Sequence, residues 1–196
     1  MTRLALIRHA ATAWSEGGRI QGRADLPLSP RGREAAARRR PPPELAGADW
    51  VSSPLARAYE TARLMGAASI AREPRLIEMD WGRWEGRRLA DLRAELGAAM
   101  AANEARGLDF RPDGGESPRD VQERIAPWLA AVAGRGRPVA AVTHKGVIRA
   151  VLALASGWDM TGKPPARLAW DCAHLFTLAR DGAPAVERLN RRLAAS

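Results

Sequence analysis

The chain has 196 residues, of which 46% are hydrophobic and 27% charged, a composition typical of a globular protein with a sizeable core. No apolar run approaches the roughly 20 residues that cross a bilayer, and the single Cys172 excludes an internal disulfide and a thiolate metal cluster. We expect one domain over residues 1–196 and a cytoplasmic location, because the first predicted strand begins at once and leaves no room for a signal peptide.

The formal net charge of +9 fits three classes of partner: nucleic acid, an anionic surface or a small anionic substrate. The densest basic run, the three arginines at residues 38–40, stands before three prolines at the predicted end of a helix. Cations suit a helix C-terminus, and no aromatic residues interleave with this run. We therefore interpret the run as a solvated helix end and expect neither nucleic acid nor a membrane as partner.

Apolar runs predict strands, whereas Ser-Pro pairs and a 3.6-residue periodicity predict helices. The predicted strands cover residues 4–7, 48–52, 69–72, 138–143, 173–178 and 184–189. Helices are predicted at residues 29–40, after Ser53-Pro54, at 89–101, from Ser117 onwards and at 147–155, with long loops at 15–28, 76–86 and 106–116. Strands that alternate with helices indicate an α/β fold, a three-layer α/β/α sandwich with a mostly parallel central sheet.

Two of the predicted strands end in ionisable residues. The first ends in Arg8-His9, and the strand at residues 138–143 ends in His144. Both histidines should lie at the carboxyl edge of a parallel sheet, where α/β proteins bind ligands. His144 also precedes a helix N-terminus, which favours an anion. Arg57 falls in the first turn of another predicted helix, where a cation is unfavourable unless it binds an anion.

These residues lie in six motifs that occur in order along the chain and that resemble those of the histidine phosphatase (phosphoglycerate mutase-like) superfamily. The motifs occupy residues 6–14, 18–32, 53–61, 76–86, 114–117 and 143–150. The resemblance implies that His9 attacks phosphorus to give a phosphohistidine, and that Arg8, Arg57 and His144 hold the phosphoryl oxygens. It also implies that Glu78 protonates the leaving alkoxide and then accepts a proton from water.

The resemblance also sorts the remaining polar residues. Glu78 occupies the family's acid position, so the neighbouring Asp80 and Glu85 are expected to be structural. Candidate substrate contacts are Ser15, Gln21, Gly22 and Lys145. His174 lies inside a predicted strand and is interpreted as structural, and no metal or other cofactor is expected. We expect the walls of the substrate pocket to come from residues 83–111.

Three positions depart from the family pattern. Ala10 stands where glycine is usual, Ala11 where an acid or amide is common, and Lys145 where a small residue is common. None of the three removes a reactive group. They bear on substrate specificity more than on the chemistry, and Lys145 adds a cation that suits an anionic substrate.

Three functions remain open. The first is a metal-independent phosphomonoesterase acting on a small phosphorylated substrate, which the short middle segment and the residues 79–82 after the acid favour by resemblance to the phosphatase branch. The second is phosphoglycerate mutase-type phosphoryl transfer. The third is a non-catalytic basic binding module, against which the presence of all five reactive side chains argues.

Overall fold

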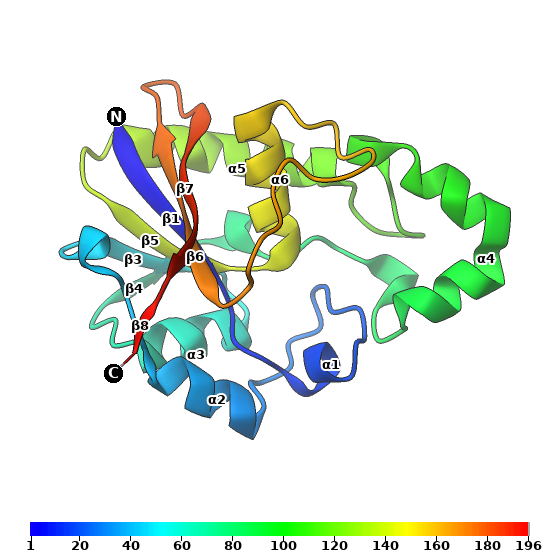
Figure 1. Ribbon diagram of the computed structural model, residues 1–196, viewed down its shortest axis with the longest axis horizontal. Helices are drawn as coiled ribbons and strands as arrows, with labels where there is room; N and C mark the ends of the chain where they lie inside the picture. Colours follow the sequence, from blue (N-terminus) through cyan, green and yellow to red (C-terminus); the bar gives the residue numbers. More distant parts are fainter. Residues whose placement is uncertain (196) are drawn as a thin grey trace.

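A computed structural model describes residues 1–195 as a six-stranded sheet with helices on both faces, which confirms the predicted α/β class (Figure 1). The strand order is β4-β3-β5-β1-β6-β7. The first four strands are parallel to one another, β6 pairs antiparallel with β1, and β7 pairs antiparallel with β6. The strands are β1 (Thr2–Arg8), β3 (Asp49–Ser52), β4 (Ile70–Arg72), β5 (Val139–Thr143), β6 (Cys172–Leu178) and β7 (Pro184–Arg192). The helices are α1 (Ala13–Glu16), α2 (Pro30–Ala37), α3 (Ala56–Leu64), α4 (Leu89–Glu104), α5 (Pro118–Ala133) and α6 (Lys145–Ser156).

The central strand β1 is buried on both faces, and its side chains alternate between two hydrophobic layers. Leu4 and Leu6 pack in the cluster that contains the apolar faces of α5 and α6. Ala5 and Ile7 pack on the opposite side, in the cluster that contains α3. Because successive side chains of a strand point to opposite faces, the continuous apolar run of β1 produces the three predicted layers.

Two predicted helices end three residues away from their expected last residue. The helix expected to reach residue 40 ends at Ala37, and Arg39–Arg40 instead form the short strand β2, which pairs antiparallel with β8 (Ala194–Ala195). The interpretation of this basic run as a helix end therefore holds for Arg38, which is the exposed C-cap of α2, and is wrong for Arg39 and Arg40. Helix α4 runs beyond residue 101 to Glu104, and Gly97 interrupts it with φ 50° and ψ −121°.

The Ser-Pro pairs begin two of the three helices for which they were used. Ser29 caps α2, and Ser117 forms a capping box with Asp120 at the start of α5. Helix α3 begins later than predicted, with Leu55 in the cap position, and the Ser53 hydroxyl instead lies 2.7 Å from His144 Nε2.

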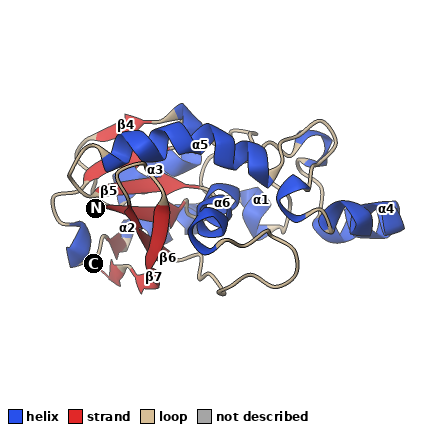
Figure 2. Ribbon diagram, turned by 90° about the horizontal axis from the view of Figure 1, so that it is seen from above, coloured by secondary structure: helices blue, strands red, loops and turns tan. Residues whose placement is uncertain are grey.

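Helix α4 extends away from the sheet (Figure 2). Its Leu92 and Met100 pack with Trp84 in a hydrophobic cluster of their own, against which the partly buried Phe110 lies. No helix within residues 1–195 combines the length and the apolar character needed to cross a lipid bilayer.

Burial of His174 in β6 should make the stability of the fold depend on pH. The side chain is fully buried, and burial lowers its pKa to about 4. Between pH 6.5 and 4 the unfolded chain protonates this histidine and the folded chain does not, so His174 alone should lower the free energy of unfolding by about 3 kcal/mol as the pH falls through this range. Urea unfolding at a series of pH values measures this slope. In a His174→Leu variant the slope should be shallower, and an unchanged slope would contradict the assignment.

Candidate active site

The carboxyl edge of the sheet brings the two predicted histidines together. Strands β1 and β5 are neighbours with Arg8 opposite Thr143, and the amide of His9 donates to the carbonyl of Thr143 at 2.9 Å. His9 and His144 follow these two residues directly, and their ring centroids lie 5.1 Å apart. The parallel pairing thus accounts for the juxtaposition of two residues that are far apart in sequence.

His9 is held as a neutral imidazole. Its Nδ1 lies 2.7 Å from the carbonyl oxygen of Ala10, so this nitrogen is assigned as the N–H donor and Nε2 keeps its lone pair. Arg57 Nε donates to that Nε2 at 3.3 Å. The ring is only 7% exposed, and burial, reinforced by Arg57 and Arg8, holds the pKa of His9 well below its ordinary value. These features suit a nucleophile.

Arg57 is fully buried in the first turn of α3, and the loop after α1 fixes its guanidinium plane. Its Nη1 donates to the carbonyl of Ala24 at 2.8 Å and its Nη2 to the carbonyl of Gly22 at 2.6 Å. The Thr61 hydroxyl links this arginine to the nucleophile's loop, since it donates to the Arg57 carbonyl and accepts from the amide of Ala10. A cation fixed in this way is oriented before any anion arrives.

Arg8 stands on the other side of His9. Its guanidinium carbon lies 5.6 Å from the centre of the Trp170 ring, a cation–π geometry. Its Nε is buried and has no hydrogen-bond partner within the described residues 1–195. The fork of this arginine is therefore available to an anionic ligand.

His144 occupies the N-cap position of α6 and is fully buried beside His9. Its Nε2 lies 2.7 Å from the Ser53 hydroxyl, while its Nδ1 is buried without a partner in the part of the chain that the structure describes. Burial and the nearby His9 and Arg57 keep the pKa of His144 well below its ordinary value. Ser53 was missed as a site residue because its Ser-Pro context indicates a helix start, which conceals its contact with a residue 91 positions away.

Glu78 faces the same edge from the loop after β4. It is 5% exposed, and its Oε1 accepts hydrogen bonds from the amides of Met79 and Gly146 at 2.9 and 3.0 Å. A β-carbon at position 146 would overlap the Glu78 carboxylate, so glycine permits this close approach. Burial raises the pKa of Glu78 although both amides oppose the shift. A raised pKa suits a carboxyl that must donate a proton.

The other two acids of this loop are engaged elsewhere. The Glu85 carboxylate accepts from the backbone amides of Arg23 and Ala24, which shapes the loop that holds Arg57. Asp80 accepts from the amide of Gly82 at 2.8 Å and forms an ion pair with Arg23 at 3.2 Å. Both contacts agree with the expectation that these acids organise loops.

The four candidate substrate contacts divide into two kinds. Thr12 caps α1 in a capping box with Ser15, and Gln21 accepts from the Thr12 hydroxyl at 2.6 Å, while the carbonyl of Gly22 holds Arg57. These three residues therefore support the loops around the site, and Ser15 also lines the cavity over His9. Lys145 instead stands at the rim, with its Nζ 5.2 Å from the centre of the Trp170 ring.

A cavity of about 380 Å³ opens over His9. It is lined by Arg8, His9, Ala10, Ala11, Ser15, Glu16, Arg39, Trp170 and Asp171. The prediction that residues 83–111 form the walls is therefore wrong for this cavity, whose far wall comes from the loop before β6. Within residues 1–195 no group of three or more His, Cys, Asp or Glu side chains is placed to hold a metal ion.

Comparison with known proteins places this geometry in a family. The profile of the histidine phosphatase superfamily (branch 1) matches residues 4–192. Glucosyl-3-phosphoglycerate phosphatase of Mycolicibacterium vanbaalenii is 35% identical over 185 residues, covering 83% of this chain and 77% of that protein. A 2,3-bisphosphoglycerate-dependent phosphoglycerate mutase of Methylobacterium radiotolerans is 32% identical, with 95% and 89% covered.

A solved structure agrees with these sequence relatives. The mycobacterial glucosyl-3-phosphoglycerate phosphatase in complex with VO3 superposes with a TM-score of 0.76 at 29% identity and covers the whole of both chains. The family profile, the relatives and the fold thus agree with the motifs from which the resemblance was drawn. The chain belongs to branch 1 of the histidine phosphatase superfamily.

Proposed function

We propose that this chain is a metal-independent phosphomonoesterase that hydrolyses small phosphorylated metabolites through a phosphohistidine on His9. The observation that carries the proposal is the fixed tautomer of His9, whose Nδ1 is bound to the Ala10 carbonyl while Nε2 keeps its lone pair beside Arg57. The membership of the chain in a phosphatase superfamily and its similarity to named phosphatases support it.

In the first step, His9 Nε2 attacks phosphorus and the P–O bond to the leaving alkoxide breaks. Glu78 gives its proton to that oxygen, so the alcohol leaves neutral and Glu78 becomes a carboxylate. Arg8 and Arg57 bind the equatorial oxygens as charge moves onto them, and His144 contributes a further contact. These fixed cations supply the charge stabilisation that a metal would otherwise provide.

In the second step, a water molecule attacks the phosphohistidine. The Glu78 carboxylate accepts the proton of that water, the P–N bond breaks, and inorganic phosphate leaves. The electron pair returns to Nε2, which restores the neutral imidazole, and Glu78 is again protonated. The cycle therefore balances without any co-reactant besides water.

Phosphoglycerate mutase-type transfer is the second candidate, since one relative at 32% identity bears that name. A mutase must keep its phosphohistidine intact while the bound substrate reorients, which requires that water be excluded. We expect release of inorganic phosphate from several monoesters, unaffected by a chelator, with little conversion of 3- to 2-phosphoglycerate. Incubation with 3-phosphoglycerate, with free phosphate and the 2-isomer followed together, is the test. Rapid isomerisation with negligible phosphate release would overturn the phosphatase assignment.

A further inference from the structure

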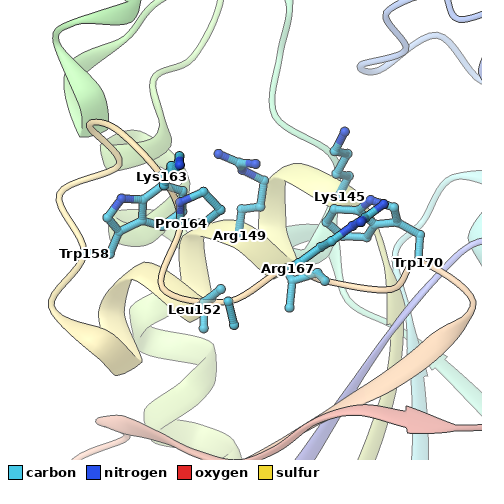
Figure 3. Close-up of a pocket in the computed structure, with 10 residues that line it drawn as sticks. Lys145, Arg149, Leu152, Trp158, Lys163, Pro164, Arg167 and Trp170 are labelled. Atoms are coloured by element: carbon cyan, nitrogen blue, oxygen red, sulfur yellow. The ribbon is translucent and has the colours of Figure 1, made fainter.

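A second cavity of about 380 Å³ lies next to the one over His9, between α6 and the loop at residues 157–171. Trp170 lines both cavities. Figure 3 shows Trp170 and Lys145 at one end of the second cavity and Trp158 and Lys163 at the other. Because the two cavities share Trp170, they are neighbours.

The lining of the second cavity is strongly cationic. It includes Lys145, Arg149, Lys163 and Arg167, together with two tryptophans, and no acidic residue. None of these four cations forms an ion pair within residues 1–195, although the chain does form such pairs elsewhere, for example between Arg119 and Asp109. Four unneutralised cations around one cavity leave a positive potential that an anion would relieve.

Helix α6 bears an electrostatic cost for this arrangement. Lys145 is its first residue, where the helix dipole disfavours a cation, and Arg149 lies one turn further along. Like charges at this spacing repel, yet Figure 3 shows both side chains rising on the same side of α6. Each head group lies over a tryptophan, Arg149 over Trp158 at 5.1 Å and Lys145 over Trp170 at 5.2 Å. The tryptophans hold the two cations in place.

We propose that this second cavity is an anion-binding subsite that takes a second phosphate group of the substrate, so that the preferred substrates carry two phosphate groups. This inference rests on the proposed function and deepens it. A phosphate dianion suits four cations better than the single charge of a carboxylate, and arginine forks match its oxygens. The inference also gives Lys145 a role, since this residue lines the second cavity beside Trp170, which both cavities share.

A series of linear alkanediol bisphosphates tests the subsite, because chain length sets the distance between the two anions. Each is compared with the alkanediol monophosphate and the ω-carboxyalkyl phosphate of equal length. We expect kcat/KM of the bisphosphates to pass through a maximum at one chain length. At that length, kcat/KM should be about ten- to hundredfold higher for the bisphosphate than for the monophosphate, with the ω-carboxyalkyl phosphate between them. Equal values for all three, or a carboxylate at least as good as the bisphosphate, would overturn the proposal.

The double variant Arg149→Gln/Lys163→Gln should reduce the ratio of bisphosphate to monophosphate kcat/KM towards one. Arg180→Gln is the matched control, because it removes an exposed cation outside both cavities, and it should keep the ratio. If the double variant keeps the wild-type ratio of bisphosphate to monophosphate kcat/KM, the preference for bisphosphates comes from the overall charge of the protein, and the subsite proposal is wrong. If no ester is hydrolysed, the proposed function fails, while calorimetric binding of the bisphosphate to wild type and its loss in the double variant still decides the subsite.

Discussion

Replacing His9 by alanine should abolish turnover of every phosphomonoester, and brief incubation with labelled substrate should mark the wild-type protein but not the variant. The reason is geometric, since Nε2 of His9 is the ring nitrogen left unprotonated at the bottom of the cavity. A phosphohistidine is labile in acid and survives alkali, so the label is measured after quenching under both conditions. Label retained on His9→Ala would place the nucleophile elsewhere.

The matched control for this experiment is His174→Leu. It also removes a buried histidine from the central sheet, but His174 lies inside β6, and neither cavity is lined by it. That variant should still take up label. Circular dichroism checks that both variants remain folded. If both then lose labelling, the loss is not specific to His9 and does not support its assignment as the nucleophile.

The arrangement of the candidate site at the edge of the sheet could be predicted from sequence because local rules determine it. An apolar run that ends in Arg8-His9 and another that ends before His144 are read directly as strands, and parallel pairing then brings their ends together. Arg57 also indicates an anion site from local sequence, because a cation in the first turn of a helix is unfavourable unless it binds an anion. In the structure these residues come from three separate elements and meet around the imidazole of His9.

The parts that sequence reasoning missed depend on contacts between distant segments. Strand β2 exists because Arg39–Arg40 pair with the last described residues, which no local pattern reveals. The wall of the cavity comes from Trp170, whose position depends on how the loop at residues 157–171 folds back over α6. Gly22 is predicted as a substrate contact, but its carbonyl group accepts from Arg57 Nη2, and a β-carbon there would overlap the Glu85 carboxylate. Both contacts are between segments far apart in the sequence.

Replacing Glu78 by glutamine should slow hydrolysis of alkyl phosphates by about 10²- to 10⁴-fold, the usual contribution of general acid catalysis. Glutamine keeps the size of the side chain and an oxygen that can accept from the amides of Met79 and Gly146, so the site should stay assembled. What it loses is the proton that the raised pKa of Glu78 keeps available for the leaving oxygen.

The leaving group decides whether this loss is due to proton donation. A p-nitrophenolate leaves without much need of a proton, so the Glu78→Gln variant should hydrolyse p-nitrophenyl phosphate with a much smaller loss in kcat/KM than alkyl phosphates. The control is Asp80→Asn, which disturbs the same loop through its ion pair with Arg23 and should affect both substrate types alike. Equal losses on both substrates in Glu78→Gln would mean that Glu78 only supports the loop, and the acid would then have to be sought elsewhere at this edge of the sheet.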